Sequence, residues 1–332
     1  MRYYRIAITN AQTGADVLPK SLGGLPICSL LPSGQVNPAA LNVELDIIQH
    51  PYHTPDGSAL VRIWGLGIDA IGSAFDLNNA NISVYAGMSK GLPLANPSQA
   101  RLLVQGAILQ AFGNWVGTDQ TIDLLIRPAT GTYGAPLNYI LNWQAGTPMA
   151  TAVAGTLQGA FPSGFQFNIN LSNRLVLNHD EYAYYQTMEQ FASVMHEISL
   201  AIIKDSGYTG VTMSISGNTV TVTDQTKPTA AIVINPQDLI GQPTWIDPGT
   251  VQAKFVLRGD LDISNVITMP QTLVTNTAGS MTSLSGQQKS VTFSGNFIVQ
   301  NIHHYGNFRQ PDAASWNTTV DMIPQKGPVS GQ

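Results

Sequence analysis

The chain has 332 residues, enough for two or three domains with their own hydrophobic cores. Only 11% of the residues are charged, whereas soluble domains usually carry about 25%, and this depletion predicts that partner subunits cover much of the surface. The net charge of −5 excludes a protein held to nucleic acid by a basic face. Cys28 is the sole cysteine, which excludes an internal disulfide and a cysteine-based zinc site.

Nothing in the sequence predicts a membrane partner. No apolar run approaches the roughly 20 residues that span a bilayer. The first ten residues are too short an apolar run for a signal peptide, and Arg5 interrupts them. We therefore expect a soluble protein that is made and matured inside a cell.

The first third of the chain has the pattern of a small β-barrel or sandwich. Short alternating runs separated by Gly and Asn turns predict strands at 3–9, 43–47, 59–66, 81–85, 101–111 and 121–127. Between the first two runs, residues 10–40 are rich in Gly, Pro and Ser. Such a long loop is uncommon inside a compact domain, so we expect an arm that is functional or contacts a partner.

The middle third mixes the two-residue period of strands with the period of about 3.6 residues that is typical of helices. Strands are expected at 138–143 and 165–171, and Thr147-Pro148 predicts a helix reaching about Gly159. A second helix is expected behind Asp180 and Glu181 and ends at Gly207, with one apolar stripe of Tyr184, Met188, Phe191, Met195, Ile198 and Ile202. A hairpin around Gly217-Asn218 is expected over 211–224.

The last third returns to strands. Residues 251–257 alternate as a half-buried strand behind a lead-in loop that contains Trp245, and the alternation resumes at Leu261 and Ile263. Further strands are expected at 291–304 and 315–323, with a loop at 280–288 and a frayed tail at 324–332. The sequence thus predicts a mainly β (α+β) chain, in which two small β-barrel or tube-type domains, 1–135 and 237–332, flank an inserted α/β domain, 136–236.

Several short motifs occur in a specific order. They are Ile63-Trp-Gly-Leu66, Asn81-Ile-Ser-Val-Tyr-Ala-Gly87, Val104-Gln-Gly-Ala-Ile108, Thr121-Ile-Asp-Leu124, Leu239-Ile-Gly-Gln-Pro243, Asn301-Ile-His-His-Tyr-Gly-Asn-Phe-Arg309 and Ser315-Trp-Asn-Thr-Thr319. In this order they resemble the baseplate (tail) hub proteins of contractile-tailed bacteriophages. The resemblance covers most of 43–127 and 239–323, and says little about the insert or the 10–40 arm.

This resemblance implies a non-enzymatic structural subunit of the virion tail baseplate, assembled in the cytoplasm of the bacterial host. Three copies would form a ring that joins the tail tube to the central spike and lets DNA pass. The implied partners are further copies of the chain, the tail tube or tube-initiator protein, the spike, the tape measure protein and baseplate wedge proteins, with DNA only in transit. Because a basic lining would hold phosphates, we expect the strand positions that face the lumen to be mainly uncharged or acidic. The alternative in the same class is the hub of a phage-derived contractile injection or secretion machine.

Two histidine motifs are weak metal candidates. Met195-His196-Glu197 would need a second His one turn later to bind zinc, and that position is Leu200. His303 and His304 are adjacent on a predicted strand, so their side chains point to opposite faces and cannot easily share a metal. We therefore expect structural roles and no metal ligands.

Two pairs of acidic residues keep an enzyme hypothesis open. Glu44 and Asp46, like Asp260 and Asp262, lie two apart on predicted strands, about 7 Å from each other, a separation that suits an inverting glycosidase. Their neighbours are polar, so a solvated strand face is favoured over a β-sandwich glycosidase. Gly65–Gly72 has the wrong glycine spacing for a dinucleotide site. No catalytic, cofactor-binding or metal residue is predicted.

A third hypothesis is a sugar-binding tail module. It requires an exposed cluster of aromatic side chains. The five tryptophans are instead scattered through separate predicted strands and loops, at Trp64, Trp115, Trp143, Trp245 and Trp316.

Overall fold

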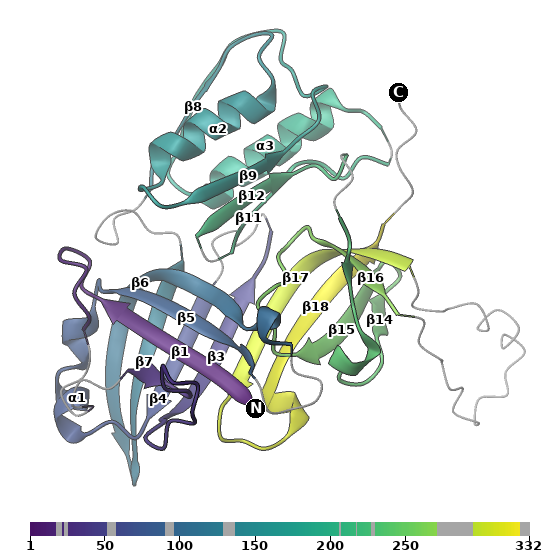
Figure 1. Ribbon diagram of the computed structural model, residues 1–332. Helices are drawn as coiled ribbons and strands as arrows, with labels where there is room; N and C mark the ends of the chain where they lie inside the picture. Colours follow the sequence, from purple (N-terminus) through teal and green to yellow (C-terminus); the bar gives the residue numbers. More distant parts are fainter. Residues whose placement is uncertain are drawn as a thin grey trace, which may run out of the picture.

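The computed structural model describes residues 1–17, 22, 26–51, 58–89, 96–128, 137–205, 207–216, 218–226, 230–270 and 295–325 (Figure 1). The expected loop at 280–288, Gly217 of the expected hairpin turn and the tail beyond residue 325 lie outside these residues. The described part is rich in strands, with two long helices confined to the insert. The mainly β class with an α/β insert is confirmed.

A single sheet runs through both β-rich parts of the chain. From one edge to the other its strands follow the order β14-β15-β18-β17-β3-β4-β7-β6-β5-β1-β2, and β16 joins β17 on one side and β13 on the other. The N-terminal strands are β1 (Arg2–Thr9), β2 (Ile27–Cys28), β3 (Asn42–Gln49), β4 (Ser58–Trp64), β5 (Asn81–Met88), β6 (Arg101–Val116) and β7 (Asp119–Pro128). The C-terminal strands are β13 (Ile232–Val233), β14 (Thr244–Asp247), β15 (Thr250–Val256), β16 (Val266–Met269), β17 (Gly295–Asn307) and β18 (Trp316–Pro324).

The two β-rich parts meet where β17 pairs with β3. This ladder is antiparallel and runs from Ile302 opposite Gln49 to Asn307 opposite Glu44. Figure 1 shows β3 and β17 side by side at the middle of the large sheet. The strands therefore form one continuous curled surface, whose two halves enclose separate apolar clusters.

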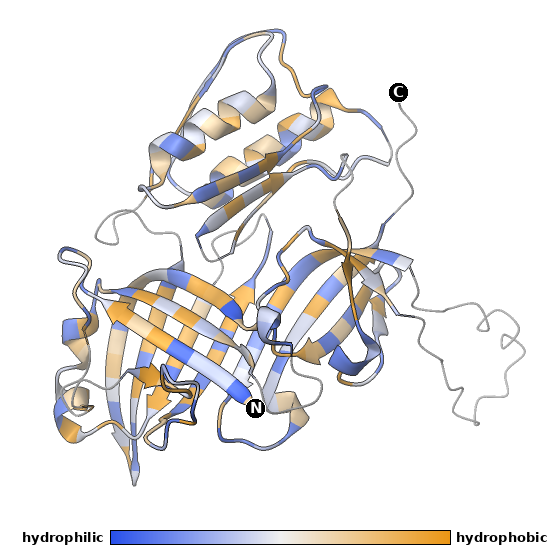
Figure 2. Ribbon diagram, in the orientation of Figure 1, coloured by the Kyte–Doolittle hydropathy of each residue, from blue (hydrophilic) through white to orange (hydrophobic). Residues whose placement is uncertain are grey.

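Alternation explains which face of each strand is buried. On β3 the side chains of Val43, Leu45 and Ile47 are buried, while those between them are partly exposed. Figure 2 shows the same alternation of apolar and polar residues along the large sheet. Two buried residues from the last third, Leu257 and Trp316, belong to the N-terminal cluster, and the partly buried Phe308 packs against it. This core is therefore built from both ends of the chain.

The insert has its own apolar core, formed by two small sheets and two helices. Its strands are β8 (Tyr139–Trp143) paired with β10 (Glu181–Tyr185), and β9 (Gln166–Asn170), β11 (Thr212–Ser216) and β12 (Thr219–Thr223) in a second sheet. The helices α2 (Met149–Ala160) and α3 (Met188–Ile202) lie between the two sheets (Figure 1). Trp143, Phe191 and Met195 are completely buried there.

The predicted second helix of the insert is wrong at both ends. Residues 181–185 form β10 and not helix, so Asp180 and Glu181 precede a strand and Tyr184 is 56% exposed. The helix α3 begins at Met188, where the Thr187 side chain accepts a hydrogen bond from the Gln190 backbone, and it ends at Ile202. Tyr184 and Met188 are four residues apart, which is helical spacing, but Tyr184 belongs to the strand β10 and Met188 is the first residue of α3 after the cap Thr187. In the first helix, Pro148 and not Thr147 is the cap residue.

Two predictions in the last third also need correction. Trp245 lies in the edge strand β14 and not in a lead-in loop. Leu261 and Ile263 are buried as expected but lie outside any strand. Ser264 takes a left-handed backbone with φ of 68°, which interrupts extended chain, and the next strand begins only at Val266.

The described parts of 10–40 fold back on the first strand. Ile27 and Cys28 pair with Ile6 and Arg5 of β1, and the backbone N–H of Val17 donates to the carbonyl of Ile8. A partner contact for this segment stays a prediction, as do the domain limits at 135/136 and 236/237.

Short helices complete the N-terminal part. α1 (Ile68–Gly72) and η2 (Ala74–Leu77) cover the far half of β6, where a side chain at Gly113 would meet the Ile71 carbonyl oxygen. η3 (Pro97–Gln99), η5 (Pro236–Asp238) and η7 (Ala313–Ser315) lie in connections between strands.

Candidate assembly surface

One face of the large sheet carries a row of polar side chains opposite the cores. We call it the polar face and define it by Asn42, Glu44, Asp46, Arg62, Asp123, Gln252, Lys254, Asn301, His303, Tyr305, Thr319 and Asp321, which alternate with buried residues on β3, β4, β7, β15, β17 and β18. It crosses the junction of β3 and β17 without a break. Both β-rich parts therefore contribute to one surface.

Arg62 organises the N-terminal half of the polar face. Its Nε and Nη2 donate to the two carboxylate oxygens of Asp123 at 2.7 and 2.9 Å. Its Nη1 lies 3.9 Å from Oε2 of Glu44. Hydrogen bonding to Asp123 raises the pKa of Arg62, so this cation is held between acids on both neighbouring strands.

The network continues across the junction of the two halves. Glu44 accepts a hydrogen bond from the Tyr305 hydroxyl at 3.0 Å, and Asp46 lies 2.8 Å from Nε2 of His303. Further along, Asp321 accepts from Gln252 at 2.8 Å and from Asn301 at 3.3 Å. Together with Arg127 of β7, the residues that define the polar face comprise four carboxylates and three Lys or Arg side chains.

The two acidic pairs differ in their position in the fold and in their hydrogen-bond partners. Glu44 and Asp46 lie on one face of β3, as predicted, and each has the hydrogen-bond partners described above. Asp260 and Asp262 follow β15 and are not on a strand, which corrects their prediction. Asp260 accepts from Nε and Nη2 of Arg258 at 2.7 and 2.8 Å. Burial raises the pKa of the Asp262 carboxyl.

A buried ionic cluster joins distant parts of the chain. Arg258 is 2% exposed, and its Nη1 lies 3.2 Å from the Asp238 carboxylate in addition to its two bonds to Asp260. Gln99, between β5 and β6, donates to Asp238 at 3.0 Å. Arg258 follows β15, whose alternation says nothing about its partners. Its partners lie 2, 20 and, through Asp238, 159 residues away, so no local pattern could have shown the cluster.

The histidines have structural surroundings. His303 and His304 face opposite sides of β17, as predicted, and His304 is 1% exposed with Nδ1 2.9 Å from the Thr318 hydroxyl. Burial lowers the pKa of His304 to about 3. Nδ1 of His196 lies 3.0 Å from the Val211 carbonyl. Among the described residues no three His, Cys, Asp or Glu side chains group as metal ligands, and the absence of catalytic and cofactor residues stays a prediction.

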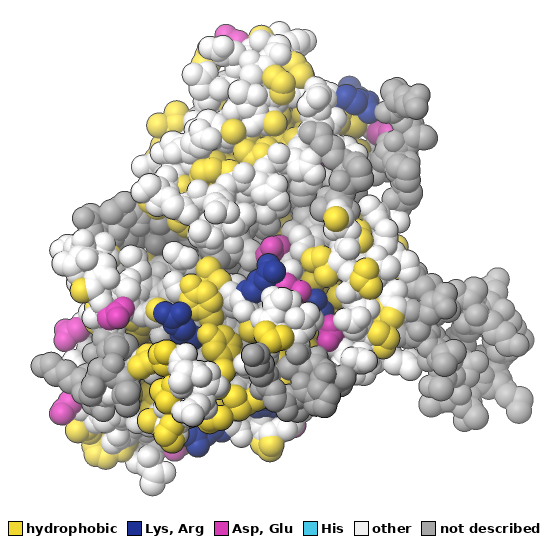
Figure 3. Space-filling view, in the orientation of Figure 1, with side chains coloured by type: hydrophobic (Ala, Val, Ile, Leu, Met, Phe, Trp, Pro, Cys, Tyr) yellow, Lys and Arg dark blue, Asp and Glu magenta, His cyan; other side chains and the backbone are white. Residues whose placement is uncertain are grey.

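Exposed apolar side chains concentrate on a few elements. Trp115 and Val116 at the end of the β6–β7 hairpin are 62% and 76% exposed. Trp245 and Ile246 lie on β14, which among the described strands pairs with β15 alone. Figure 3 shows that charged side chains are sparse on the visible face and that apolar ones gather over its lower half. Within the described ranges, no helix is long and apolar enough to cross a bilayer.

Comparison with solved structures identifies the fold. A tail protein from Neisseria meningitidis MC58 aligns with a TM-score of 0.53 at 10% identity, covering 98% of this chain and 97% of its own. The 43 kDa tail protein of prophage MuSo2 from Shewanella oneidensis gives 0.52 at 7% identity, with the same coverage. The chain has the fold of phage tail proteins. The predicted resemblance to tail hub proteins is thereby confirmed at the level of the fold.

A third solved structure with this fold comes from a secretion machine. The E. coli c3393 protein is described as a component of the type VI secretion system with structural similarity to the T4 bacteriophage tail proteins gp27 and gp5. It aligns with a TM-score of 0.52 at 11% identity, covering 88% of this chain and 76% of its own. By sequence alone, no family model matches the chain, and no curated protein does.

Proposed function

We propose that this chain is a non-enzymatic structural hub subunit of a phage tail baseplate, in which three copies form a ring between the tail tube and the central spike. The observation that carries the proposal is the continuous sheet, which runs through both ends of the chain within a tail-protein fold. A chain with two β-rich halves in one sheet contributes two similar arcs to a ring. Three copies then supply six arcs, which suits a six-fold tube on one side and a three-fold spike on the other.

The polar face is the surface we assign to the ring lumen. It is continuous across both halves, and its carboxylates outnumber its cations. DNA phosphates are held chiefly by basic side chains through release of counterions, so such a lining lets DNA pass. The remaining proposed partners are the tube or tube-initiator protein, the spike, the tape measure protein and the wedge proteins, in a virion tail assembled in the host cytoplasm.

The oligomeric state tests this proposal. We expect native mass spectrometry of the purified protein to give three times the chain mass of 35.5 kDa, and negative-stain images to show rings. A compact monomer at micromolar concentration would overturn it. A separate experiment tests the lumen assignment. Thr319→Lys adds a positive charge to the polar face and should make the rings retain short DNA duplexes at low salt.

A second candidate is the hub of a phage-derived injection or secretion machine, favoured by the fold shared with the type VI component. Copurification distinguishes them, since a phage hub is expected in tail particles from an induced host. The β-sandwich glycosidase makes the opposite forecast for Asp46→Asn and Glu44→Gln. In that hypothesis these variants abolish sugar hydrolysis. In ours there is no hydrolysis to lose, and the variants still assemble into rings.

A further inference from the structure

The outer face of the insert carries an aromatic platform. β8 buries Tyr139, Leu141 and Trp143 against the helices, and the alternate positions of β8 and of its partner β10 point away from the core. Ile140 is 67% exposed, Tyr182 63% and Tyr184 56%. The register places Tyr184 opposite Ile140 and Tyr182 opposite Asn142, so these residues form one contiguous patch. We call them, with Asn138, the outer face.

Hydrogen bonds hold the two tyrosine rings in place. The Tyr184 hydroxyl donates to Oδ1 of Asn138 at 2.8 Å, and the Tyr182 hydroxyl donates to Oδ2 of Asp180 at 3.3 Å. The two phenols reach toward opposite ends of the strand pair, so the rings lie along the sheet and do not project freely from it. The strand beneath is fixed by the buried core, and therefore little conformational entropy is lost when a ligand covers the rings.

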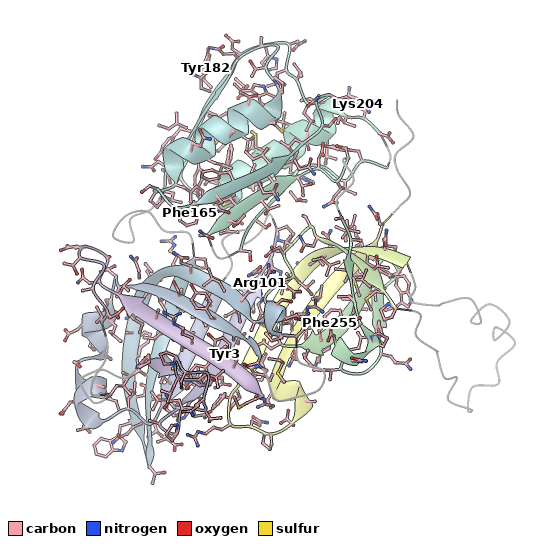
Figure 4. All side chains as sticks on the ribbon, in the orientation of Figure 1. Tyr3, Arg101, Phe165, Tyr182, Lys204 and Phe255 are labelled. Atoms are coloured by element: carbon pink, nitrogen blue, oxygen red, sulfur yellow. The ribbon has the colours of Figure 1, made fainter. Side chains whose placement is uncertain are left out.

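The outer face is too small for a stable protein interface. A specific interface typically takes about 20–30 residues from each partner, and the outer face offers a handful. Figure 4 shows Tyr182 at the margin of the insert that lies away from the large sheet, on which Tyr3, Arg101 and Phe255 are labelled. The patch is thus not a continuation of the proposed ring surface.

Charge restricts the ligand further. None of the outer-face residues is an acid or a base that is charged at neutral pH, and the Tyr182 hydroxyl donates to the carboxylate of Asp180. Residues 137–205 carry five acidic side chains against two basic ones. An anionic ligand would therefore be repelled, while the amide groups of Asn138 and Asn142 can donate to and accept from hydroxyls.

We propose that the outer face binds a neutral glycan. Tyrosine is suited to this ligand because its ring offers an apolar surface to the C–H face of a sugar while its hydroxyl remains polar. Tyr182 and Tyr184 are about 7 Å apart along the strand, so neighbouring sugars of one chain contact both rings. This inference does not depend on the ring of three copies.

Binding by the full chain to defined oligosaccharides tests the proposal. Chitohexaose, maltohexaose and cellohexaose are the neutral probes and hexagalacturonate is the anionic one, each titrated by calorimetry. We expect at least one neutral probe to bind and the anionic probe not to bind. The double variant Tyr182→Ala/Tyr184→Ala should lose at least tenfold in affinity for that probe. Phe75→Ala, which removes a ring 62% exposed on η2, should leave the affinity unchanged.

Three outcomes would overturn the proposal. They are no binding of any neutral probe at millimolar concentration, equal affinity of the double variant and the unchanged chain, and equal binding of hexagalacturonate. Native mass spectrometry of the double variant distinguishes a sugar site from a contact between copies of the chain. If the substitutions change the oligomeric state but not glycan binding, the outer face is a contact between copies and not a sugar site.

Discussion

His304 sits in a fully used hydrogen-bond arrangement. The Thr318 hydroxyl donates its one proton to the Arg258 carbonyl and accepts from the Arg258 backbone N–H. With the hydroxyl proton on that carbonyl, Thr318 accepts from Nδ1 of His304, which corresponds to the neutral tautomer with its proton on that nitrogen. A second proton on this ring would place an unpaired charge in the core.

This arrangement makes stability depend on pH. Because burial lowers the pKa of folded His304 from 6.5 to about 3, the unfolded chain binds a proton in that window that the folded chain does not. The free energy of unfolding should fall as pH drops below 6.5, by about 2 kcal/mol from this group at pH 5. Urea unfolding of His304→Gln should show a flatter dependence between pH 6.5 and 4, whereas His303→Gln, on the opposite face, should keep the slope. An unchanged slope in His304→Gln would refute the assignment.

Arg258 should be among the most sensitive charged residues. Arg258→Met leaves the buried carboxylate of Asp238 and the 17% exposed carboxylate of Asp260 without their cation, and we expect a loss of about 3–5 kcal/mol. Arg62→Met is the matched control, since its side chain is 39% exposed and exposed pairs contribute about 1 kcal/mol or less.

A combined variant tests the cause of that loss. Adding Asp238→Asn and Asp260→Asn to Arg258→Met removes the unpaired charges and should recover part of the stability in denaturant unfolding. No recovery would mean that Arg258 acts through packing and not through charge.

Elements whose apolar residues follow one clear period could be predicted from the sequence. Elements whose residues fit both the strand period and the helix period could not. The strands around Val43, Ile63 and Val320 alternate cleanly between buried and exposed positions, so their existence followed from the sequence. Residues 181–188 fit both periods, because Tyr184 and Met188 are four apart and Tyr182 and Tyr184 are two apart. Pairing with β8 decided the outcome, and that pairing is a tertiary effect. The exposed tyrosines of the outer face were missed for this reason.

The contact between α1 and β6 gives a prediction for one element. Gly113→Ala places a methyl group 2.2 Å from the Ile71 carbonyl oxygen, so the backbone must move, and we expect a destabilisation of about 1–3 kcal/mol. Gly155→Ala is the opposite control, because Gly155 is exposed in α2 with open space around it and alanine favours a helix by about 0.5–1 kcal/mol. Thermal unfolding of both variants measures the difference. Equal stabilities would show that α1 does not press on β6.

At the scale of the whole molecule, Trp316 links the two ends of the chain. It belongs to β18 but is buried in the N-terminal cluster, and its Nε1 donates to the Gly87 carbonyl at 3.0 Å. Trp316→Ala should cost about 3–5 kcal/mol and lower amide hydrogen-exchange protection in β4 and β5 as well as in β18. Trp115→Ala, at an exposed position, should change stability by about 0.5 kcal/mol or less. Loss of protection in β18 alone would mean that the two halves are energetically independent.

The pairing of the two halves was beyond the reach of sequence patterns. Alternation shows that β3 and β17 are strands with one buried face, but it does not say which strand lies beside which. The prediction of two flanking β units was correct in that both parts consist mainly of strands. It could not show that these strands belong to one sheet. The buried cluster of Gln99, Asp238, Arg258 and Asp260 is unpredictable for the same reason, since it exists only once distant segments have met.

The ladder between β3 and β17 also constrains how this chain is made. Glu44 and Asn307 are neighbours in the sheet but more than 250 residues apart in synthesis order. At typical ribosomal rates, β3 waits on the order of ten seconds or more for its neighbour, with one edge of its backbone unpaired. During that interval the nascent chain presents an open template for any other extended segment. Translation speed and chaperone supply, and not only final stability, therefore govern how much of this protein reaches its assembly.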